Sequence, residues 1–215
     1  MRFRTVIFDC DSTLTALEGI DDLAVGHRQE IARLTALAMA GAVPLEEVYG
    51  RRLDLIRPSR ARVERIGRRY IEALVPGARE TVQSLHDAGM AVQILSGGLA
   101  PAVRVLARHL GMSDQQVAAV DLRFGPGGEY AGFDLTSPLT RSGGKRLWIE
   151  SAGAELPRPR LLVGDGATDL EARPAVDAFA AFTGVVSRDD VASQADVVIP
   201  GPSLTAVLAY CGIPG

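Results

Sequence analysis

Lysine is almost missing from this chain, because its 23 basic residues comprise 22 arginines and a single lysine, Lys145. The acidic residues number 26, so the formal net charge is only -3 at pH 7. A chain without excess positive charge lacks the usual electrostatic footprint of a nucleic-acid binder, and we expect no nucleic-acid partner. A bias toward arginine explains the 22 arginines, but it does not explain the one lysine.

Cysteines and long apolar runs are also scarce. Cys10 and Cys211 are too few for a disulfide framework, and this favours a reducing compartment. No Cys/His cluster suggests a zinc site. No window approaches the ~18 uncharged apolar residues of a membrane span. The first apolar stretch, residues 6–8, is followed at once by Asp9, which argues against a signal peptide. We therefore expect a cytoplasmic protein without a membrane partner.

The apolar pattern divides the chain into two regions. Hydrophobic residues make up 47% of the sequence, as in an ordinary globular protein of one or two domains. Residues 3–8 form a β-rich run, whereas residues 17–74 show helical spacing broken by Gly41, Pro44 and Pro58 into about four helices. Beyond residue 76 helices and strands alternate. The expected strands there are 90–95, 117–124 with a hairpin to 133, 160–163, 176–181 and 196–199, and the expected helices are 78–88, 101–110, 144–152, 168–172, 188–193 and 203–210.

This order predicts an α/β fold, a Rossmann-like and mostly parallel sheet flanked by helices, with an inserted helical-bundle cap. The expected division is a core domain of residues 1–15 and 76–215 and a cap domain of residues 16–75. Residues 51–69 hold eight arginines against two acids. This run is either a solvated helix face or, less simply, a field that attracts an anionic substrate.

Ligands of open α/β sheets bind beyond the carboxyl ends of the strands, and the first expected strand ends in Asp9-Cys10-Asp11-Ser12-Thr13. Because side chains alternate along an extended chain, Asp9 and Asp11 project the same way and Cys10 projects the opposite way. Two adjacent carboxylates repel each other and favour a cation or a shared proton between them. The alternative is a loop whose aspartates cap a helix.

Two further strand ends bear candidate ligands. Residue 95 is followed by Ser96-Gly97-Gly98 and a helix, where a hydroxyl and free N–H groups suit an anion such as phosphate. A tight strand-to-helix turn is the simpler alternative. The strand ending at residue 163 leads into Gly164-Asp165-Gly166-Ala167-Thr168-Asp169, in which two carboxylates cluster beside glycines. The third glycine of a dinucleotide fingerprint is missing there, and a glycine turn capped by aspartate remains the alternative.

The single lysine follows Gly143-Gly144 at an expected helix start, where the helix dipole disfavours a cation. A compact ammonium can serve where the planar fork of arginine cannot, so Lys145 is either a functional residue or a chance survivor. Carboxylates, an anion cradle and one ammonium together suit phosphoryl transfer. A carboxylate can form an aspartyl-phosphate, and Mg²⁺ binds few carboxylates while it keeps phosphate oxygens as ligands.

The order of these motifs resembles that of the haloacid dehalogenase superfamily of phosphatases, which is D-x-D-x-T, then Ser or Thr, then Lys, then paired acids. Longer stretches resemble the phosphoserine phosphatase family within it. They are Glu18-Gly-Ile-Asp-Asp-Leu-Ala24, Ala38-Met39-Ala-Gly41, Arg52-Leu-Asp-Leu-Ile56, Gly128-Glu-Tyr-Ala-Gly-Phe133 and Ser142-Gly-Gly-Lys145. The contexts of Glu18 and Arg52 are more specific than the core motifs. Leu45 and Leu99 depart from the family, which commonly has Phe there.

The resemblance implies a catalytic role for each core motif. Asp9 would be the nucleophile, and Asp11 would be the general acid for the leaving oxygen and then the base for the hydrolytic water. Mg²⁺ would be bound by Asp9, the backbone carbonyl of Asp11 and Asp165, with Asp169 supporting it from behind. Lys145 would contact the phosphoryl oxygens.

The resemblance also implies a substrate, O-phospho-L-serine, and a set of residues that bind it. Ser96 and Gly97 would hold the phosphoryl group, Glu18 would meet the substrate ammonium and Arg52 its carboxylate. The pocket would be completed by Met39, Ala40, Gly98 and Thr168. The implied reaction is hydrolysis to L-serine and phosphate, in L-serine biosynthesis, by a monomer or a homodimer.

Two other readings stay open. The same aspartyl-phosphate could pass its phosphoryl group to an alcohol such as homoserine, or arise from another small phosphomonoester. A phospho-accepting signalling module of receiver type also uses acids, a hydroxyl and a lysine. Receiver modules are shorter, however, and they lack a second acid at the position of Asp11.

Overall fold

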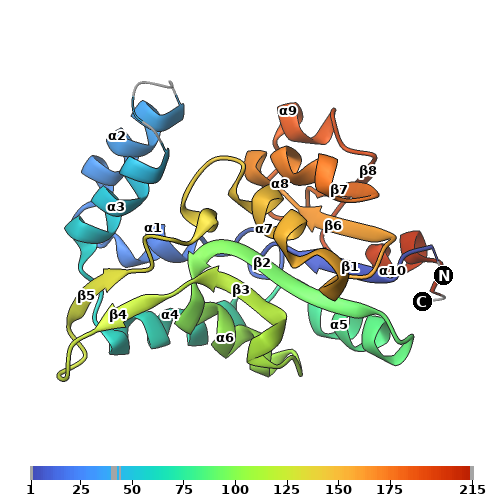
Figure 1. The fold of residues 1–215 in the computed structure, drawn as a ribbon, viewed down its shortest axis with the longest axis horizontal. Coiled ribbons are helices and arrows are strands. Elements are labelled where there is room, and N and C mark those ends of the chain that lie inside the picture. Colours follow the sequence, from blue (N-terminus) through green and yellow to red (C-terminus); the bar gives the residue numbers. More distant parts are fainter. Residues whose placement is uncertain (1, 40–42, 44, 214–215) are drawn as a thin grey trace.

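A parallel six-stranded sheet forms the centre of the molecule (Figure 1). A computed structural model describes residues 2–39, 43 and 45–213, and for residues 35–39 and 45 it describes the backbone alone. In spatial order the strands are β3 (Val117–Val120), β2 (Ala91–Leu99), β1 (Thr5–Phe8), β6 (Arg160–Gly164), β7 (Ala178–Phe182) and β8 (Val197–Ile199), and all neighbours pair in parallel. The α/β fold class expected from the alternating pattern is confirmed.

Helices cover both faces of this sheet. On one face lie α5 (Ala78–Asp87), α6 (Ala100–His109) and α10 (Ala206–Cys211), and on the other lie α7 (Gly144–Ala152), α8 (Ala167–Ala172) and α9 (Asp189–Ala192) (Figure 1). The chain runs from β1 outward to β2 and β3 and then returns to β6 on the other side of β1, so the strand order reverses at this central strand. Crevices at such switch points bind ligands in open α/β sheets, which directs attention to the carboxyl end of β1.

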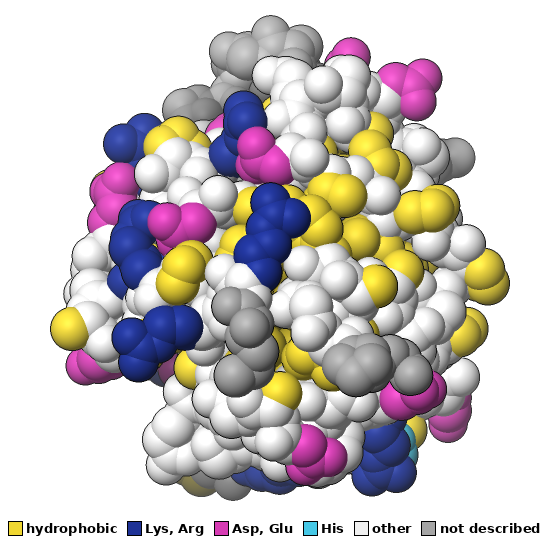
Figure 2. Space-filling view, turned by 90° about the vertical axis from the view of Figure 1, so that its right-hand side faces the viewer, with side chains coloured by type: hydrophobic (Ala, Val, Ile, Leu, Met, Phe, Trp, Pro, Cys, Tyr) yellow, Lys and Arg dark blue, Asp and Glu magenta, His cyan; other side chains and the backbone are white. Residues whose placement is uncertain are grey.

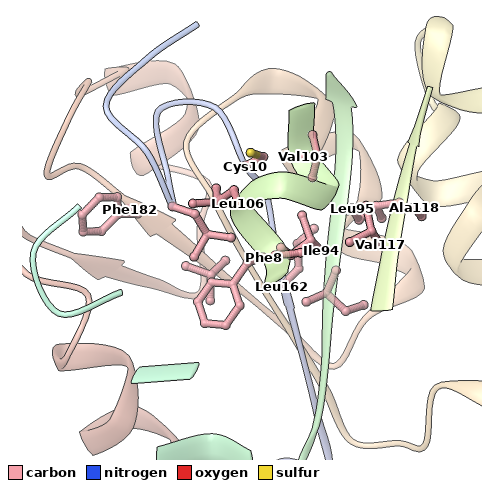
Figure 3. Packing of buried hydrophobic residues seen from close by; sticks show 14 of the residues in the cluster. Phe8, Cys10, Ile94, Leu95, Val103, Leu106, Val117, Ala118, Leu162 and Phe182 are labelled. Carbon is pink, nitrogen blue, oxygen red and sulfur yellow. The ribbon is translucent and has the colours of Figure 1, made fainter. Parts of the chain in front are cut away.

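Apolar side chains from both layers bury β1. All four of its residues are buried, and Phe8 packs among Ile94, Leu162 and other members of the core cluster (Figure 3). Cys10 is completely buried, as its alternation with the flanking aspartates predicted. The first acidic motif therefore projects from a rigid, close-packed strand, which fixes its position.

Two details differ from the expected elements. The stretch Ser96-Gly97-Gly98 is not a turn, because β2 continues through it to Leu99, which pairs with Val120 after an irregular register shift. The expected strand 117–124 is two strands, because the strand is interrupted at Asp121. The carboxylate of Asp121 accepts two hydrogen bonds from Arg104, of 2.7 and 3.2 Å. Beyond this break β4 (Leu122–Phe124) pairs antiparallel with β5 (Tyr130–Phe133) in a separate hairpin.

Among the described residues between β1 and α5 there are four helices, namely α1 (Gly19–Leu23), α2 (Arg28–Met39), α3 (Leu45–Ile56) and α4 (Arg60–Glu72). Helix α4 lies directly against α6 (Figure 1). Gly67 permits this approach, because a Cβ atom there would fall 2.6 Å from the Cβ of Val105. The hairpin also joins these helices, since the ring of Tyr49 meets Phe133 edge-on with centroids 5.4 Å apart. A cap domain bounded at 16 and 75 stays a prediction.

The arginine-rich run 51–69 is mostly engaged in contacts within the protein. Arg51, Arg52 and Arg69 form ion pairs with Glu47, Asp21 and Asp22, Arg62 donates to two backbone carbonyls, and Arg57 and Arg60 lie over the rings of Tyr130 and Phe124. The run therefore anchors α3 and α4 to their neighbours rather than forming a free field of positive charge.

The outer surface of the molecule mixes both signs of charge. On the face shown in Figure 2, acidic and basic side chains are interspersed with apolar ones, so this face carries no continuous field of one sign. Within the described parts of the chain, no helix is both long enough and apolar enough to cross a membrane. Cys10 and Cys211 are both free and buried.

Candidate active site

Four charged side chains meet beyond the carboxyl ends of β1 and β6. Asp9 follows β1, Asp165 follows β6, and Lys145 and Asp169 lie in the first turns of α7 and α8. The Nζ atom of Lys145 lies 2.8 Å from Oδ1 of Asp9 and 2.7 Å from Oδ1 of Asp169. Burial would lower the pKa of Lys145, but the two carboxylates raise it above its usual value, so the lysine stays protonated. Lys145, the one lysine of the chain, thus connects its own motif with the motifs of Asp9 and Asp169.

Glycine makes room for the acid on α8. A Cβ atom on Gly164 would fall 2.2 Å from Cγ of Asp169, so only glycine allows that carboxylate to fold back beneath the end of β6. The Gly166 N–H then donates to Oδ2 of Asp169 at 3.1 Å. Asp169 is completely buried, and its pKa is raised by burial and by the charge of Asp9. Its supporting place behind a metal ion stays a prediction.

Three of these carboxylates could hold a metal ion. Asp9, Asp165 and Asp169 each offer one oxygen, and the three oxygens lie within 4.8 Å of one another. Burial, followed by the charge of Asp9, raises the pKa of Asp165 to about 6. Crowded, partly dehydrated carboxylate oxygens are the donor set that a hard divalent cation prefers, and such a cation would relieve their repulsion. The residues therefore fit a divalent metal.

Asp11 has one satisfied and one unsatisfied oxygen. Its Oδ2 accepts the Gly19 N–H at 3.0 Å, whereas Oδ1 is buried and has no hydrogen-bond partner among the described residues. Burial and then the charge of Glu18 raise the pKa of Asp11 to about 7. Interactions of this carboxyl with the Tyr70 hydroxyl and the Gly19 N–H lower the pKa in part. A carboxyl with this pKa can both donate and accept a proton near neutral pH.

The irregular end of β2 presents a hydroxyl beside these charges. Ser96 is buried, and its Oγ accepts the Gly98 N–H at 3.0 Å. A hydroxyl that accepts in this way still has its own proton to donate. The hydroxyl therefore lies on an irregular strand and not on a turn, and the binding of an anion there stays a prediction.

Glu18 and Arg52 approach the same site from the helical segment. Oε1 of Glu18 accepts the Ser12 hydroxyl at 2.7 Å. Arg52 forms an ion pair with Asp21, but its buried Nε has no partner among the described residues. A buried N–H group without an acceptor destabilises the folded protein, so we expect a bound ligand to provide an acceptor for this atom.

Most of these groups line one cavity of about 260 Å³. The predicted residues that line it are Asp9, Asp11, Glu18, Arg52, Ser96, Gly97, Gly98, Lys145, Asp165 and Thr168. Ala40 lies outside the described residues, and the side chain of Met39 is not described either, so their predicted places in the pocket are not tested.

Sequence reasoning missed other residues that line the cavity, above all Tyr49 and Arg188. Arg188 follows the carboxyl end of β7 and pairs with Oδ2 of Asp165. The strand-end rule that found the aspartates also applies to Arg188, so a signal existed. Tyr49 had none, because it occupies an ordinary buried position of helix α3.

Comparisons with known proteins agree with this arrangement. The haloacid dehalogenase-like hydrolase family model matches residues 6–174. Phosphoserine phosphatase of Bos taurus is 41% identical over 194 residues, which cover 89% of this chain and 86% of that protein. The human enzyme is 41% identical over 193 residues and covers 88% and 86%. A solved structure described as a phospho-aspartyl intermediate analogue of phosphoserine phosphatase superposes with a TM-score of 0.81, at 27% identity and 100% coverage of both chains. The chain belongs to the haloacid dehalogenase-like hydrolases and, within them, to the phosphoserine phosphatase family.

Proposed function

We propose that this enzyme hydrolyses O-phospho-L-serine to L-serine and phosphate through an aspartyl-phosphate on Asp9. The observation that supports this best is the charge layout of one cavity. Lys145 and Ser96, which would hold a phosphoryl group, line the same cavity as Glu18 and Arg52. An ammonium suits Glu18, and a carboxylate suits a guanidinium, so the three charged groups of phosphoserine each find a partner.

The first chemical step belongs to Asp9. Its Oδ1 accepts hydrogen bonds from the Cys10 N–H at 2.8 Å and from Lys145, which fixes the carboxylate on the rigid end of β1. A carboxylate oxygen of Asp9 forms a bond to phosphorus while the bond from phosphorus to the serine oxygen breaks. Asp11 gives its proton to that leaving oxygen, and its pKa of about 7 leaves a protonated fraction available at neutral pH.

The second step reverses the role of Asp11. As a carboxylate it accepts a proton from water while the water oxygen attacks phosphorus, the acyl-phosphate bond breaks and Asp9 is restored. We assign the metal to Asp9, the backbone carbonyl of Asp11 and Asp165, with Asp169 behind them and Mg²⁺ as the cation. When bound, this cation neutralises charge on the transferred phosphoryl group. Ser96, Gly97 and Lys145 hold the remaining phosphoryl oxygens.

The helical segment supplies specificity in this proposal. Residues 16–75 act as a cap that carries Glu18 and Arg52 over the phosphoryl site, and Met39, Ala40, Gly98 and Thr168 complete the wall. Two free, buried cysteines are consistent with a reducing compartment, and we propose the cytoplasm as the location.

Phosphate release from a panel of small phosphomonoesters tests the function. We expect hydrolysis of O-phospho-L-serine with Mg²⁺, little without a divalent cation, and none by Asp9→Asn, which controls for contaminating phosphatases. The D enantiomer and esters that lack the ammonium or carboxylate should react more slowly. If homoserine phosphate forms when homoserine is added, the activity is phosphoryl transfer and not hydrolysis. A stable phosphoenzyme that does not turn over would favour a receiver-like module.

A further inference from the structure

One peptide group in the phosphoryl-binding strand is held at both of its ends. The hydroxyl of Tyr49 donates a hydrogen bond to the Gly97 carbonyl at 3.0 Å. The N–H of the same peptide group, on Gly98, donates to Oγ of Ser96 at 3.0 Å. Two opposed hydrogen bonds define the plane of a peptide that lies between glycines, which have no side chains to restrict its rotation. Tyr49 and Ser96 are therefore connected through a single rigid unit.

Tyr49 is well placed to act as a fixed support. It comes from helix α3, only 6% of the residue is exposed, and its ring packs edge-on against Phe133 of the hairpin. Burial raises the pKa of its phenol above the usual value, so the hydroxyl keeps its proton as a donor. A buried side chain that is held by packing presents its hydroxyl at a defined point.

The consequence falls on the hydroxyl of Ser96. Because Oγ accepts from Gly98, the proton of the hydroxyl points away from that bond, which restricts how the hydroxyl can face the cavity that Ser96 lines. Rotation of the Gly97–Gly98 peptide would remove this constraint and let the hydroxyl turn. The connection between Tyr49 and Ser96 is short, because it passes through one peptide group.

We propose that Tyr49 is a positioning residue that orients the Ser96 hydroxyl for the phosphoryl group by holding the Gly97–Gly98 peptide. Helix α3 thereby acts on the phosphoryl site through Tyr49 and also contributes Arg52 to the lining of the same cavity. This inference rests on the proposed function, because Ser96 is assigned to the phosphoryl group there. Tyr49 itself does not touch the reacting atoms.

A double-mutant cycle separates this role from simple packing. Tyr49→Phe keeps the ring against Phe133 and removes the hydroxyl alone. We expect kcat/KM for phosphoserine to fall about three- to tenfold, as for loss of one neutral hydrogen bond. In a Ser96→Ala background the same change should cost less than about twofold, because its route through Ser96 is gone. A fall of equal size in both backgrounds would overturn the proposal.

Tyr130→Phe is the matched control. The Tyr130 hydroxyl is buried but has no hydrogen-bond partner among the described residues, and it lies outside the cavity, so this variant should retain full activity. Equal losses for Tyr49→Phe and Tyr130→Phe would also overturn the proposal. Thermal unfolding of each variant without ligand shows whether the fold is retained.

Orthophosphate binding keeps this test independent of the substrate assignment. The rise in unfolding temperature with orthophosphate and Mg²⁺ gives its affinity for each member of the cycle. Affinity weakened by Tyr49→Phe only when Ser96 is present supports the proposal even if phosphoserine proves not to be the substrate. Unchanged affinity and unchanged kcat/KM in an enzyme that does hydrolyse phosphoserine would refute the positioning role and leave the proposed function intact.

Discussion

Asp11→Asn should make the metal-free protein more stable while it removes turnover. The pKa of Asp11 is raised from 3.8 to about 7, chiefly by burial and then by the charge of Glu18. A carboxyl group whose pKa is higher in the folded than in the unfolded state stabilises the folded protein fully at pH values below its unfolded pKa. This stabilisation is lost as the pH rises toward the folded pKa. Asparagine cannot ionise, so the variant escapes the loss.

The size of this effect follows from the shift in pKa. A shift of about three units corresponds to about 4 kcal/mol, since each unit is worth about 1.4 kcal/mol. Asp11 retains some contact with cavity water, because the residue is not fully buried although its Oδ1 is. We therefore expect a total of about 2 to 4 kcal/mol, of which roughly 2 kcal/mol should develop between about pH 5 and about pH 9.

Urea unfolding at the two ends of this pH range, with a chelator present, measures the difference. Asp54→Asn, on the exposed face of α3, is the control for the amide substitution itself. An Asp11→Asn protein whose stability relative to wild type is the same at both pH values would refute the argument that burial raises this pKa. In the activity assay the same variant should lose turnover by at least about a hundredfold, as expected for a general acid–base residue.

Three further changes test other parts of the site. Lys145→Arg should lower kcat by about a hundredfold or more without unfolding the protein, because the bulkier fork cannot replace one buried ammonium, whereas exposed Arg146→Lys should leave kcat unchanged; retained turnover of the Lys145→Arg protein would contradict this. Arg52→Lys should raise KM for phosphoserine about tenfold, and neighbouring Arg51→Lys, which pairs only with a residue of its own helix, should not. Arg188→Gln should tighten Mg²⁺ binding in calorimetry by about two- to fivefold, because its guanidinium competes for a carboxylate of the acidic cluster; weaker binding would argue that Arg188 supports the metal.

The fold was largely predictable because helices and strands alternate clearly after residue 76. The main difference at the site, the continuation of β2 through Ser96-Gly97-Gly98, was not predictable from local pattern. A hydroxyl followed by two glycines is typical of a turn, yet neither glycine adopts a positive φ here. Pairing of Leu99 with Val120 keeps this stretch in the sheet, so tertiary contacts override the local preference.

The charged members of the site were predictable for a different reason. Strand ends of an α/β sheet converge, so Asp9, Asp11 and Asp165 could be placed together from chain order alone, and Lys145 stood out because it is the only lysine. Arg188 was hidden among 22 arginines. The pKa of Asp11 could not be predicted either, because it depends on how deeply one carboxyl is buried and on the distance to Glu18, which only the folded structure defines.

The unpartnered atoms of the structure bear on selectivity. Four buried side-chain polar atoms lack a hydrogen-bond partner among the described residues, and two of them, Oδ1 of Asp11 and Nε of Arg52, belong to residues that line the cavity. Each such atom costs about 1 to 3 kcal/mol until a ligand satisfies it. A substrate with a leaving oxygen at one end and a carboxylate at the other would satisfy both, whereas a phosphomonoester without the carboxylate leaves Arg52 unpaired. That deficit alone predicts a preference of about ten- to a hundredfold, so the cavity selects its substrate by what an incorrect ligand fails to pair.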